Sequence, residues 1–412
     1  MNIYFSGIGG VGIGPLAEIA HDAGYQVQGS DRGASLMTRE LEKRGVAISF
    51  NQDGSFLEQC HSKQPIDWFV YTAALPPDHP ELVRARALGI RTAKRDELLA
   101  HIIADKQLKL IAIAGTHGKT TTTGMMVWTL QQLGTAVSYS IGTTISFGPS
   151  GKYDPASEYF VYECDEFDRN FLHFQPYLSL ITSVDYDHPD TYPTPDDYQA
   201  AFSQFINQSA HTIMWQHDAA GLTIPASAWL LGDDEAANIQ LPGAHNRRNA
   251  TLVLKALEHL GLPENRAIIE AFPGTNRRFE KLAYNLYSDY GHHPVEIAAT
   301  LQMARELSDD VVLVYQPHQN VRQHEIRDQY VDSVFKDAEE IYWLPTYLSR
   351  EDPTLEILTP QQLTSTLYDS NFHFSELNDD LWQNIEKVRQ AGKLVLCMGA
   401  GSIDGWLREH LV

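Results

Sequence analysis

Short apolar runs that alternate with amphipathic stretches dominate this chain, and the series restarts twice. The first series begins with a strand-like run at Asn2–Ile8 and continues with a helical pattern over Pro15–Ala23. A second series begins at Leu108–Ala114, and a third follows Gly274. Strand-like runs that alternate with helical segments form βαβ units, whose strands are parallel. The sequence therefore predicts an α/β protein built on parallel sheets.

The length of the chain implies more than one domain. A single hydrophobic core stops growing near roughly 250–300 residues, beyond which chains divide, and this chain has 412 residues. The polar run Asp105–Gln107 is typical of a linker, and the dipeptide Pro273–Gly274 is typical of a turn between modules. We therefore predict three domains, at residues 1–106, 107–273 and 274–412.

The net charge of the chain restricts its partners, and its cysteines indicate its compartment. The chain has 31 Lys and Arg against 53 Asp and Glu, and its net charge of −22 repels nucleic acid and acidic membranes. Its three cysteines lack metal-type spacing, as expected in a reducing compartment. No apolar run approaches the roughly 20 residues of a membrane span, and no cationic leader opens the chain. We expect a cytoplasmic protein without nucleic-acid or integral membrane contacts, as a monomer or homodimer.

A glycine-rich loop, Gly7–Gly12, joins the first predicted strand to the first predicted helix. In such a GxGxxG loop, the missing side chains let backbone N–H groups approach a diphosphate at the helix N-terminus. Asp31 follows the next strand, about 20 residues on, where a ribose-binding carboxylate would stand. The loop fits a dinucleotide site, a UDP-sugar site, or a tight turn that needs glycine for packing.

A second glycine-rich loop lies between the buried strand Leu108–Ala114 and a helix predicted over Thr120–Leu133. The amides of such a loop hold the β- and γ-phosphates of a nucleotide, its lysine pairs with their charge, and its hydroxyl ligates Mg²⁺. Ile113 replaces the first glycine of the strict pattern, so the match is to GxxGK[ST], and a turn with an idle lysine is the alternative. The predicted phosphate-binding residues are Gly115, Thr116, His117, Gly118, Lys119, Thr120 and Thr121.

Acidic residues gather at the ends of two further strand-like runs, at Glu163–Asp168 and at Asp185–Asp190. Strand ends are where the sites of α/β proteins form. Carboxylates crowded there repel one another unless a cation lies between them, which favours a divalent metal with His188 as an additional ligand. A solvated acidic loop is the alternative for either cluster alone.

Further motifs follow in the last third of the chain, and together with those above they resemble the Mur ligase family over nearly the whole length. The resemblance implies a Rossmann-like UDP-binding domain, a central P-loop ATPase domain and a C-terminal Rossmann-like α/β domain. The segments that carry it are GIGGVGIGPLAEIAHDAGYQVQGSD, AGTHGKTTTT, ECDEFDRNFL, DYDHPDTY, PGAHNRRNA, GTNRRFE, DYGHHPVE and QPH.

The resemblance also implies where the substrates bind. The implied contacts to a UDP-linked substrate are Gly9, Gly10, Val11, Gly12, Ser30, Asp31, Thr72 and Ala73. Beyond the phosphate loop, the implied contacts to ATP are His245, Asn246, Asn249, Arg278 and Asp289. The implied contacts to the incoming amino acid are Tyr290, His292, His318 and Arg322.

The family's chemistry is the ATP-driven formation of an amide through an acyl phosphate, and the resemblance implies its reacting groups here. The motifs are most similar to the branch that joins L-alanine to UDP-N-acetylmuramate in peptidoglycan precursor synthesis. The implied ligands of Mg²⁺ are Thr120, Glu163 and His188. The implied catalytic residues are Lys119, Glu163, His188, Arg278 and His292.

The sequence after QPH departs from the alanine-adding pattern HRYTRT, and only Arg322 keeps a cation there. A murein tripeptide is therefore an alternative acceptor. A regulator that binds nucleotides without turnover is a second alternative, although it would not need a set of side chains aimed at a γ-phosphate. A dinucleotide-dependent oxidoreductase is a third, but it leaves the Gly-Lys-Thr loop unexplained.

Overall fold

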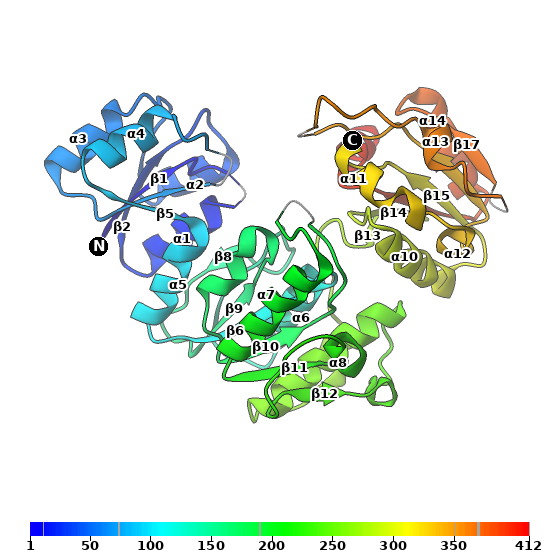
Figure 1. Ribbon diagram of the computed structural model, residues 1–412, viewed down its shortest axis with the longest axis horizontal. Helices are drawn as coiled ribbons and strands as arrows, with labels where there is room; N and C mark the ends of the chain where they lie inside the picture. The colour runs from blue at the N-terminus through cyan, green and yellow to red at the C-terminus, as the bar shows by residue number, and fades with distance from the viewer. Residues whose placement is uncertain (11, 73–74, 189–190, 350, 369–370, 412) are drawn as a thin grey trace. The chain divides into compact units, whose positions relative to one another are not determined.

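The computed structural model describes residues 1–10, 12–72, 75–188, 191–349, 351–368 and 371–411 (Figure 1). The chain forms two compact units. The first unit comprises Met1–Ala236 with Ala250–Phe272, and the second comprises Ala237–Asn249 with Pro273–Val412. Helix α8 (Ala244–His259) contributes residues to both units. The boundaries of the three domains proposed above stay predictions.

Five parallel strands form the first sheet of the first unit, in the order β3-β2-β1-β4-β5. Ile3 and Phe5 of the central strand pack in one core cluster and Tyr4 in another, because helices cover both faces of the sheet. The strands are β1 (Asn2–Ser6), β2 (Gln26–Ser30), β3 (Ala47–Ser49), β4 (Trp68–Tyr71) and β5 (Arg91–Lys94). The helices are α1 (Gly14–Asp22), α2 (Leu36–Lys43), α3 (Ser55–Lys63), α4 (Pro80–Ala87) and α5 (Arg95–Asp105).

Seven strands form the second sheet of the same unit, in the order β12-β11-β10-β6-β9-β7-β8. The pairs are parallel except for the antiparallel pair of β7 with β8. The strands are β6 (Lys109–Ala114), β7 (Val137–Ser140), β8 (Gly151–Lys152), β9 (Tyr159–Glu163), β10 (Leu178–Ile181), β11 (His211–Trp215) and β12 (Trp229–Leu231). The α-helices, besides α8, are α6 (Lys119–Gln132), α7 (Pro195–Gln208) and α9 (Arg266–Glu270).

Six strands form the sheet of the second unit, in the order β13-β14-β18-β15-β16-β17, and only the pair of β13 with β14 is antiparallel among the described strands. The strands are β13 (Glu280–Ala283), β14 (Leu286–Asp289), β15 (Val311–Tyr315), β16 (Glu340–Trp343), β17 (Phe372–Phe374) and β18 (Leu394–Met398). The helices are α10 (Pro294–Leu307), α11 (Asn320–Ile326), α12 (Asp332–Phe335), α13 (Pro360–Leu363), α14 (Asp379–Gln390) and α15 (Ile403–His410).

Local sequence explains several of these elements. Strands β10, β15 and β18 are buried at every position, as expected for apolar runs covered on both faces. Helix α7 begins where Thr194 accepts a hydrogen bond from the backbone N–H of Asp197 and Pro195 fixes the first turn. The predicted α/β class with parallel-rich sheets is confirmed. Among the described residues, no helix is long and apolar enough to cross a membrane.

Candidate functional site

The predicted phosphate loop lies between β6 and α6 and packs against the residues that follow β10. The backbone N–H of Thr116 donates to the carbonyl of Ser183 at 3.0 Å, and that of His117 donates to Ser183 Oγ at 2.9 Å. Gly115 has a φ of +138°, and a Cβ there would lie 2.3 Å from Thr182 Oγ1. Only glycine fits this position, so the loop has a single well-defined path at the carboxyl edge of the sheet.

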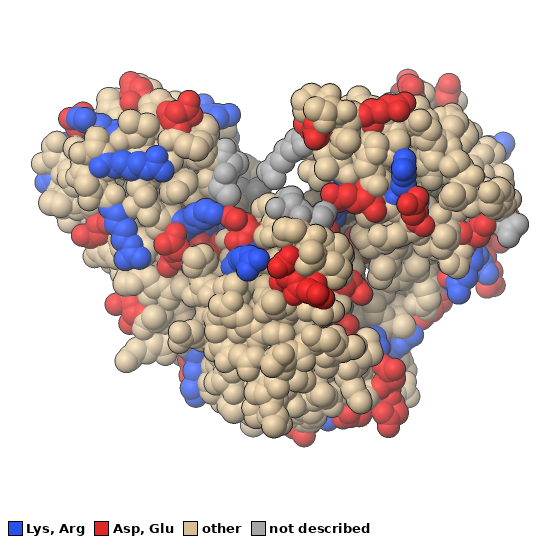
Figure 2. Space-filling view, in the orientation of Figure 1, with Lys and Arg blue, Asp and Glu red and all other residues tan. Residues whose placement is uncertain are grey.

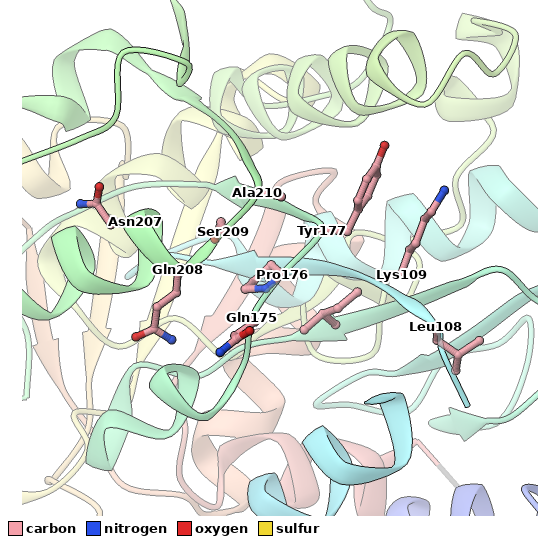
Figure 3. Close-up of a pocket in the computed structure, with 10 residues that line it drawn as sticks. Leu108, Lys109, Gln175, Pro176, Tyr177, Asn207, Gln208, Ser209 and Ala210 are labelled. Atoms are coloured by element: carbon pink, nitrogen blue, oxygen red, sulfur yellow. The ribbon is translucent and has the colours of Figure 1, made fainter. Parts of the chain in front are cut away.

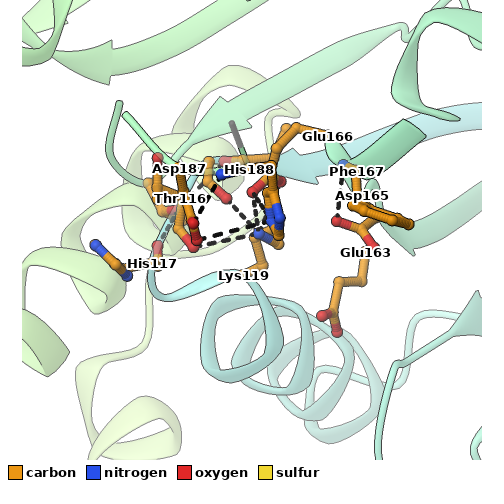
Figure 4. A network of polar contacts seen from close by, with 12 residues as sticks. Thr116, His117, Lys119, Glu163, Asp165, Glu166, Phe167, Asp187 and His188 are labelled. Atoms are coloured by element: carbon orange, nitrogen blue, oxygen red, sulfur yellow. Dashed lines mark hydrogen bonds and ion pairs between the residues drawn. The ribbon is translucent and has the colours of Figure 1, made fainter. Parts of the chain in front are cut away.

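Lys119, the first residue of α6, directs its ammonium back into this loop (Figure 4). Nζ donates to the carbonyl of Gly115 at 2.6 Å and to that of Thr116 at 3.2 Å. It also donates to both carboxylate oxygens of Glu166, at 2.8 and 3.0 Å. The cation is therefore fixed where a P-loop lysine would contact the phosphates of a nucleotide.

Lys119 and Glu166 form a buried ion pair, with side chains 14% and 1% exposed. Burial disfavours the ammonium, but the carboxylates of Glu166 and Asp165 outweigh it, so the pKa of Lys119 is raised. Burial raises the pKa of the Glu166 carboxyl to about 7, and the adjacent Lys119 opposes that rise. The lysine stays charged at neutral pH, as phosphate binding requires.

A second polar pair lies beside the first turn of α6. The hydroxyl of Thr120 donates to Glu163 Oε1 at 2.8 Å, and the backbone N–H of Gly142 donates to Glu163 Oε2 at 3.0 Å. A Cβ at Gly142 would lie 3.0 Å from both carboxylate oxygens, so glycine leaves the space that the carboxylate occupies. Two of the three predicted metal ligands, Thr120 and Glu163, are thus brought together.

The third predicted ligand, His188, has a φ of +59° and lies in the loop after β10. Its Nε2 is 3.7 Å from Glu166 Oε1 and 3.7 Å from Asp187 Oδ2, and its ring packs edge-on against Phe167 at 5.2 Å. Figure 4 shows His188 next to Glu166 and Asp187. Within the described part of the chain, no cluster of three or more His, Cys, Asp or Glu side chains has the geometry of a metal site. The role of His188 as a metal ligand stays a prediction.

Two tyrosines support this site, and sequence reasoning missed both. Tyr198, on the buried face of α7, is 2.8 Å from Thr116 Oγ1 through its hydroxyl. Tyr192 donates its hydroxyl to the carbonyl of Glu166 at 2.5 Å. Tyr198 fits the apolar face of a helix, and Tyr192 precedes that helix. Nothing local in the sequence signals that either hydroxyl reaches this site.

In the first sheet, the predicted UDP loop follows β1 and is tied to the end of β2. The backbone N–H of Gly9 donates to Asp31 Oδ2 at 2.7 Å. The hydroxyl of Ser30 donates to Glu81 Oε2 at 2.8 Å, and Glu81 is fully buried. This carboxylate also accepts hydrogen bonds from the hydroxyls of Tyr4 and Ser6, at 2.7 and 2.6 Å. Glu81, which sequence reasoning did not single out, thus holds the strand ends that carry the loop.

The structure describes some of the other residues of the predicted UDP site. The backbone N–H of Gly10 donates to the carbonyl of Gly7 at 3.0 Å, which closes the turn. A Cβ at Gly12 would lie 3.4 Å from the guanidinium of Arg95, so a cation lies close to the loop. Thr72 follows β4 at the same sheet edge. The remaining two predicted residues, Val11 and Ala73, lie outside the described residues.

In the second unit, Asp289 ends β14 and fixes the segment before it. Its Oδ2 accepts from the N–H of Phe279 and its Oδ1 from that of Gly291, both at 2.7 Å. Burial raises the pKa of Asp289 to about 6, against the opposing effect of the guanidinium of Arg278 and these two N–H groups. The structure therefore brings two of the predicted ATP-binding residues, Asp289 and Arg278, close together.

The predicted amino-acid site forms one cluster in this unit. The guanidinium carbon of Arg278 lies 5.4 Å from the centre of the Tyr290 ring, a cation–π contact. His292 Nε2 is 2.9 Å from an N–H group of Arg322, and the ring of His292 packs edge-on against that of His318 at 5.6 Å. The four predicted residues come from two segments, one after β14 and one after β15, and meet at the carboxyl ends of these strands.

The segment that carries the predicted ATP-binding residues His245, Asn246 and Asn249 is anchored to α10 of the same unit through Glu306. Its carboxylate pairs with both terminal nitrogens of Arg247, at 2.8 and 2.9 Å, and accepts from the backbone N–H of Gly243 at 3.0 Å. The hydrogen bonds from Arg247 lower the pKa of Glu306 to about 2. Close packing lowers the pKa of His245 to about 4, and Asn249 is 5% exposed. The contact of these residues with ATP stays a prediction.

We expect Glu306→Gln to lower the free energy of unfolding of the second unit by about 1–3 kcal/mol at neutral pH, because it removes charge-assisted hydrogen bonds. The folded-state pKa of Glu306 is depressed, so its contribution is present above the ordinary glutamate pKa and is lost as pH falls toward about 2. Denaturant titration across the acidic range measures both effects.

The matched control is Glu258→Gln, which removes an exposed pair with Lys255 on α8 and should change stability by less than about 0.5 kcal/mol. Equal losses in the two variants, or a difference independent of pH, would contradict the role assigned to Glu306.

A separate hollow lies at the opposite edge of the second sheet (Figure 3). Lys109, Tyr177 and Gln208 line it with neighbouring residues, at the amino ends of β6, β10 and β11. Ligands of open α/β sheets bind at the carboxyl ends of the strands, so this hollow is not the nucleotide site. On the face shown in Figure 2, acidic and basic side chains are interspersed.

A phosphate loop with its lysine and hydroxyl in place, at the carboxyl edge of a parallel sheet, defines an α/β nucleotide-binding protein. Residues 2–107 match the model of the Mur ligase family, catalytic domain, and residues 113–228 match the Mur ligase middle domain. The UDP-N-acetylmuramate–L-alanine ligase of Jannaschia sp. (strain CCS1) is 30% identical over 98% of this chain and 94% of its own. That of Nocardioides sp. (strain ATCC BAA-499 / JS614) is 31% identical over 97% and 93%. The chain therefore belongs to the Mur ligase family.

Solved structures show the same fold. The UDP-N-acetylmuramate-alanine ligase from Thermotoga maritima matches with a TM-score of 0.74 and 24% identity, covering 100% of this chain and 98% of its own. A murein peptide ligase from Psychrobacter arcticus 273-4 matches with a TM-score of 0.63 and 23% identity over 100% and 98%. The fold is thus common to relatives with different acceptors.

Proposed function

We propose that this protein is an ATP-dependent ligase that joins L-alanine to UDP-N-acetylmuramate through an acyl phosphate, in the synthesis of peptidoglycan precursors. The observation that carries the proposal is the phosphate loop with Lys119 buried against it, in a chain that aligns over nearly its full length with relatives of that name. The cluster around His292 and Arg322 supports it with a second site for the amine.

The chemistry follows from the poor reactivity of a carboxylate toward amines. Transfer of the γ-phosphoryl group to the muramate carboxylate gives a mixed anhydride, in which phosphate is a good leaving group. Lys119 stabilises the negative charge on the transferring group, and the amides of the loop around Gly115 hold the neighbouring phosphates. Arg278 is the second cation that we assign to the γ-phosphate. The amine then displaces phosphate and leaves an amide.

We propose Mg²⁺ as the metal and Thr120 and Glu163 as the residues that hold it. A hydroxyl and a carboxylate 2.8 Å apart at the start of α6 are hard oxygen donors, and Mg²⁺ is commonly bound by one or two carboxylates together with substrate phosphates and waters. When bound, the ion would neutralise charge on the β- and γ-phosphates. His188 remains the additional ligand proposed from the sequence.

We place the UDP-linked substrate on the loop after β1, with Gly9, Ser30 and Asp31 at its base. We place the reaction in the cytoplasm, where ATP is available. The three cysteines are free and buried, as is usual in a reducing compartment.

The test is a reaction of the purified chain with Mg²⁺, ATP and UDP-N-acetylmuramate, to which L-alanine, glycine, L-serine or murein tripeptide is added separately. Phosphate release is recorded together with the mass of the UDP-linked product. We expect release that depends on both the muramate and L-alanine, with the mass gain of one alanyl residue. Product only with tripeptide would replace the acceptor, and no product with any amine would refute the ligase.

A further inference from the structure

Arg278, the second cation that we assign to the γ-phosphate, lies in a turn with an unusual backbone. The residues on either side of it, Arg277 and Phe279, have φ angles of +58° and +47°. Residues with a Cβ rarely adopt this left-handed conformation, and it persists only where the surrounding structure holds it. The direction of the Arg278 side chain therefore depends on contacts made by its two neighbours.

Phe279 is held from the sheet of the second unit. Its backbone N–H donates to Asp289 Oδ2 at 2.7 Å, and its ring stacks on that of Tyr287 with the ring centres 4.6 Å apart. Both partners belong to β14. The backbone on this side of the turn is thus determined by the strand that ends at the site.

Arg277 is held from several directions. Its carbonyl accepts a hydrogen bond from the N–H of Tyr290 at 2.8 Å, and its own N–H donates to Glu280 Oε2 at 2.8 Å. Its guanidinium donates to the carbonyl of Gly399 at 2.9 Å, and its Nε lies 3.6 Å from Asp404 Oδ2. The side chain of Arg277 is therefore directed to the loop after β18 and to the first turn of α15.

Asp404, the second residue of α15, is a buried carboxylate with no role in the site described above. Its Oδ1 accepts from the hydroxyl of Ser288 at 2.7 Å, and its Oδ2 accepts from Arg408 Nε at 3.0 Å. Burial disfavours the carboxylate, but the hydrogen bonds from Arg408 and Ser288 outweigh it, so the pKa of Asp404 is lowered. The charge of Arg277 acts in the same direction. Asp404 is therefore an anion at neutral pH.

These groups form a closed circuit of charges at one end of the turn. Arg408, which pairs with Asp404, also donates to Glu280 Oε2 at 2.6 Å. The same oxygen of Glu280 accepts the backbone N–H of Arg277. Two cations and two anions thus offset one another, and α15 is joined through them to the turn.

Arg277 and Arg278 lie close to each other, because both contact the ring of Tyr290. Their guanidinium carbons are 4.7 and 5.4 Å from the centre of that ring. Two cations this close repel one another, and a phosphate would attract both. Asp404 offsets the charge of Arg277, which favours the observed position of Arg277 beside α15.

We propose that Asp404 is a positioning residue for phosphoryl transfer: through Arg277 it keeps the turn in the conformation that directs Arg278 toward the γ-phosphate. Asp404 acts through Arg277 and not on a substrate. The last helix of the chain thereby contributes to the chemical step. This inference rests on the proposed ligase activity. The competing explanation is that Asp404 only packs α15 against β14 through Ser288.

The first measurement needs no turnover. The full-length protein with Mg²⁺ and UDP-N-acetylmuramate is titrated with ADP and with β,γ-imido-ATP, which differ in the γ-phosphate. We expect Asp404→Asn to weaken binding of imido-ATP by about tenfold or more and binding of ADP by less than about twofold, because a misplaced guanidinium loses a charge-assisted hydrogen bond to the γ-phosphate. A purely structural role would change both affinities equally or leave both intact.

The second measurement follows acyl phosphate formation, with hydroxylamine as a trap that converts the acyl phosphate into a hydroxamate. We expect Asp404→Asn to lower kcat by about 10²-fold and to change KM for UDP-N-acetylmuramate by less than about threefold, since a small displacement of a catalytic group affects the chemical step most. In an Arg278→Ala background, Asp404→Asn should cause no further loss, because the residue that it positions is absent.

Arg277→Gln removes the same ion pair but leaves the hydrogen bonds of Asp404 to Ser288 and Arg408 in place. It should show the same selective losses, and it decides the question if Asp404→Asn does not fold. The matched control is Glu386→Gln, which removes the pair of Glu386 with Arg389 on α14 of the same unit. It should leave both measurements unchanged.

Equal changes for imido-ATP and ADP in Arg277→Gln, or a further loss when Asp404→Asn is added to Arg278→Ala, would overturn the inference. A wild type that forms no hydroxamate would instead overturn the proposed ligase. In that case a selective loss of imido-ATP affinity in Asp404→Asn would still support the positioning of Arg278.

Discussion

Lys119→Ala is expected to lower kcat of the ligase reaction by about 10³-fold or more, because the transferring γ-phosphoryl group loses its nearest fixed cation in a buried site. The ammonium is held by two loop carbonyls and by Glu166, so its position is set before a nucleotide arrives. The measurement is acyl phosphate formation, trapped as hydroxamate, at saturating ATP.

Two further variants distinguish the loss of the Lys119 charge at the phosphate loop from an effect on folding. Lys109→Ala removes the same charge from the opposite end of β6, where Lys109 pairs with Glu158 at the surface, and should retain full activity. Lys119→Arg keeps a cation for Glu166 but not the compact ammonium, so it should fold like the wild type and stay strongly impaired. Activity of Lys119→Ala within tenfold of the wild type would refute the assigned role.

Gly115→Ala is expected to abolish ATP binding and to lower the stability of the first unit by about 3 kcal/mol or more, since a positive φ and overpacking each cost about 1–3 kcal/mol. The added Cβ would meet Thr182 Oγ1 at 2.3 Å and the backbone of Ser183 at 2.8 Å. Both neighbours hold the loop in place, so neither can move without releasing it. Calorimetric unfolding and nucleotide titration measure the two effects.

The matched control is Gly405→Ala on helix α15, where an added Cβ would meet no atom within 4 Å. That change should stabilise the helix by up to about 1 kcal/mol, because alanine has the higher helix propensity. Normal ATP affinity in Gly115→Ala would show that the loop can take another path.

The sequence predicted those parts of the fold that local patterns of residues determine. The apolar run before the phosphate loop forms β6 (Lys109–Ala114), and the helix predicted over Thr120–Leu133 is α6 (Lys119–Gln132). The spacing of the glycines identified the phosphate loop, because few residue types other than glycine can adopt the backbone conformation of such a loop. Strand order, by contrast, depends on which apolar faces meet in space, and the sequence alone left it open.

The parts of the site that the sequence did not reveal are contacts between distant segments. Lys119 and Glu166 are 47 residues apart, and Thr116 and Tyr198 are 82 apart. Each partner alone fits an ordinary acidic loop or an apolar helix face. Their roles follow only from the placement of β9, β10 and α7 beside the phosphate loop.

The buried carboxylate of Glu81 has a consequence for how this sequence can diverge. Three hydroxyls, from Tyr4, Ser6 and Ser30, share that one acceptor group. Loss of the carboxylate alone would leave all three buried without their partner, whereas loss of one hydroxyl would leave two in place. These four positions are therefore expected to vary together among relatives. A substitution of Glu81 in a chain that keeps the three hydroxyls should be the rarest change.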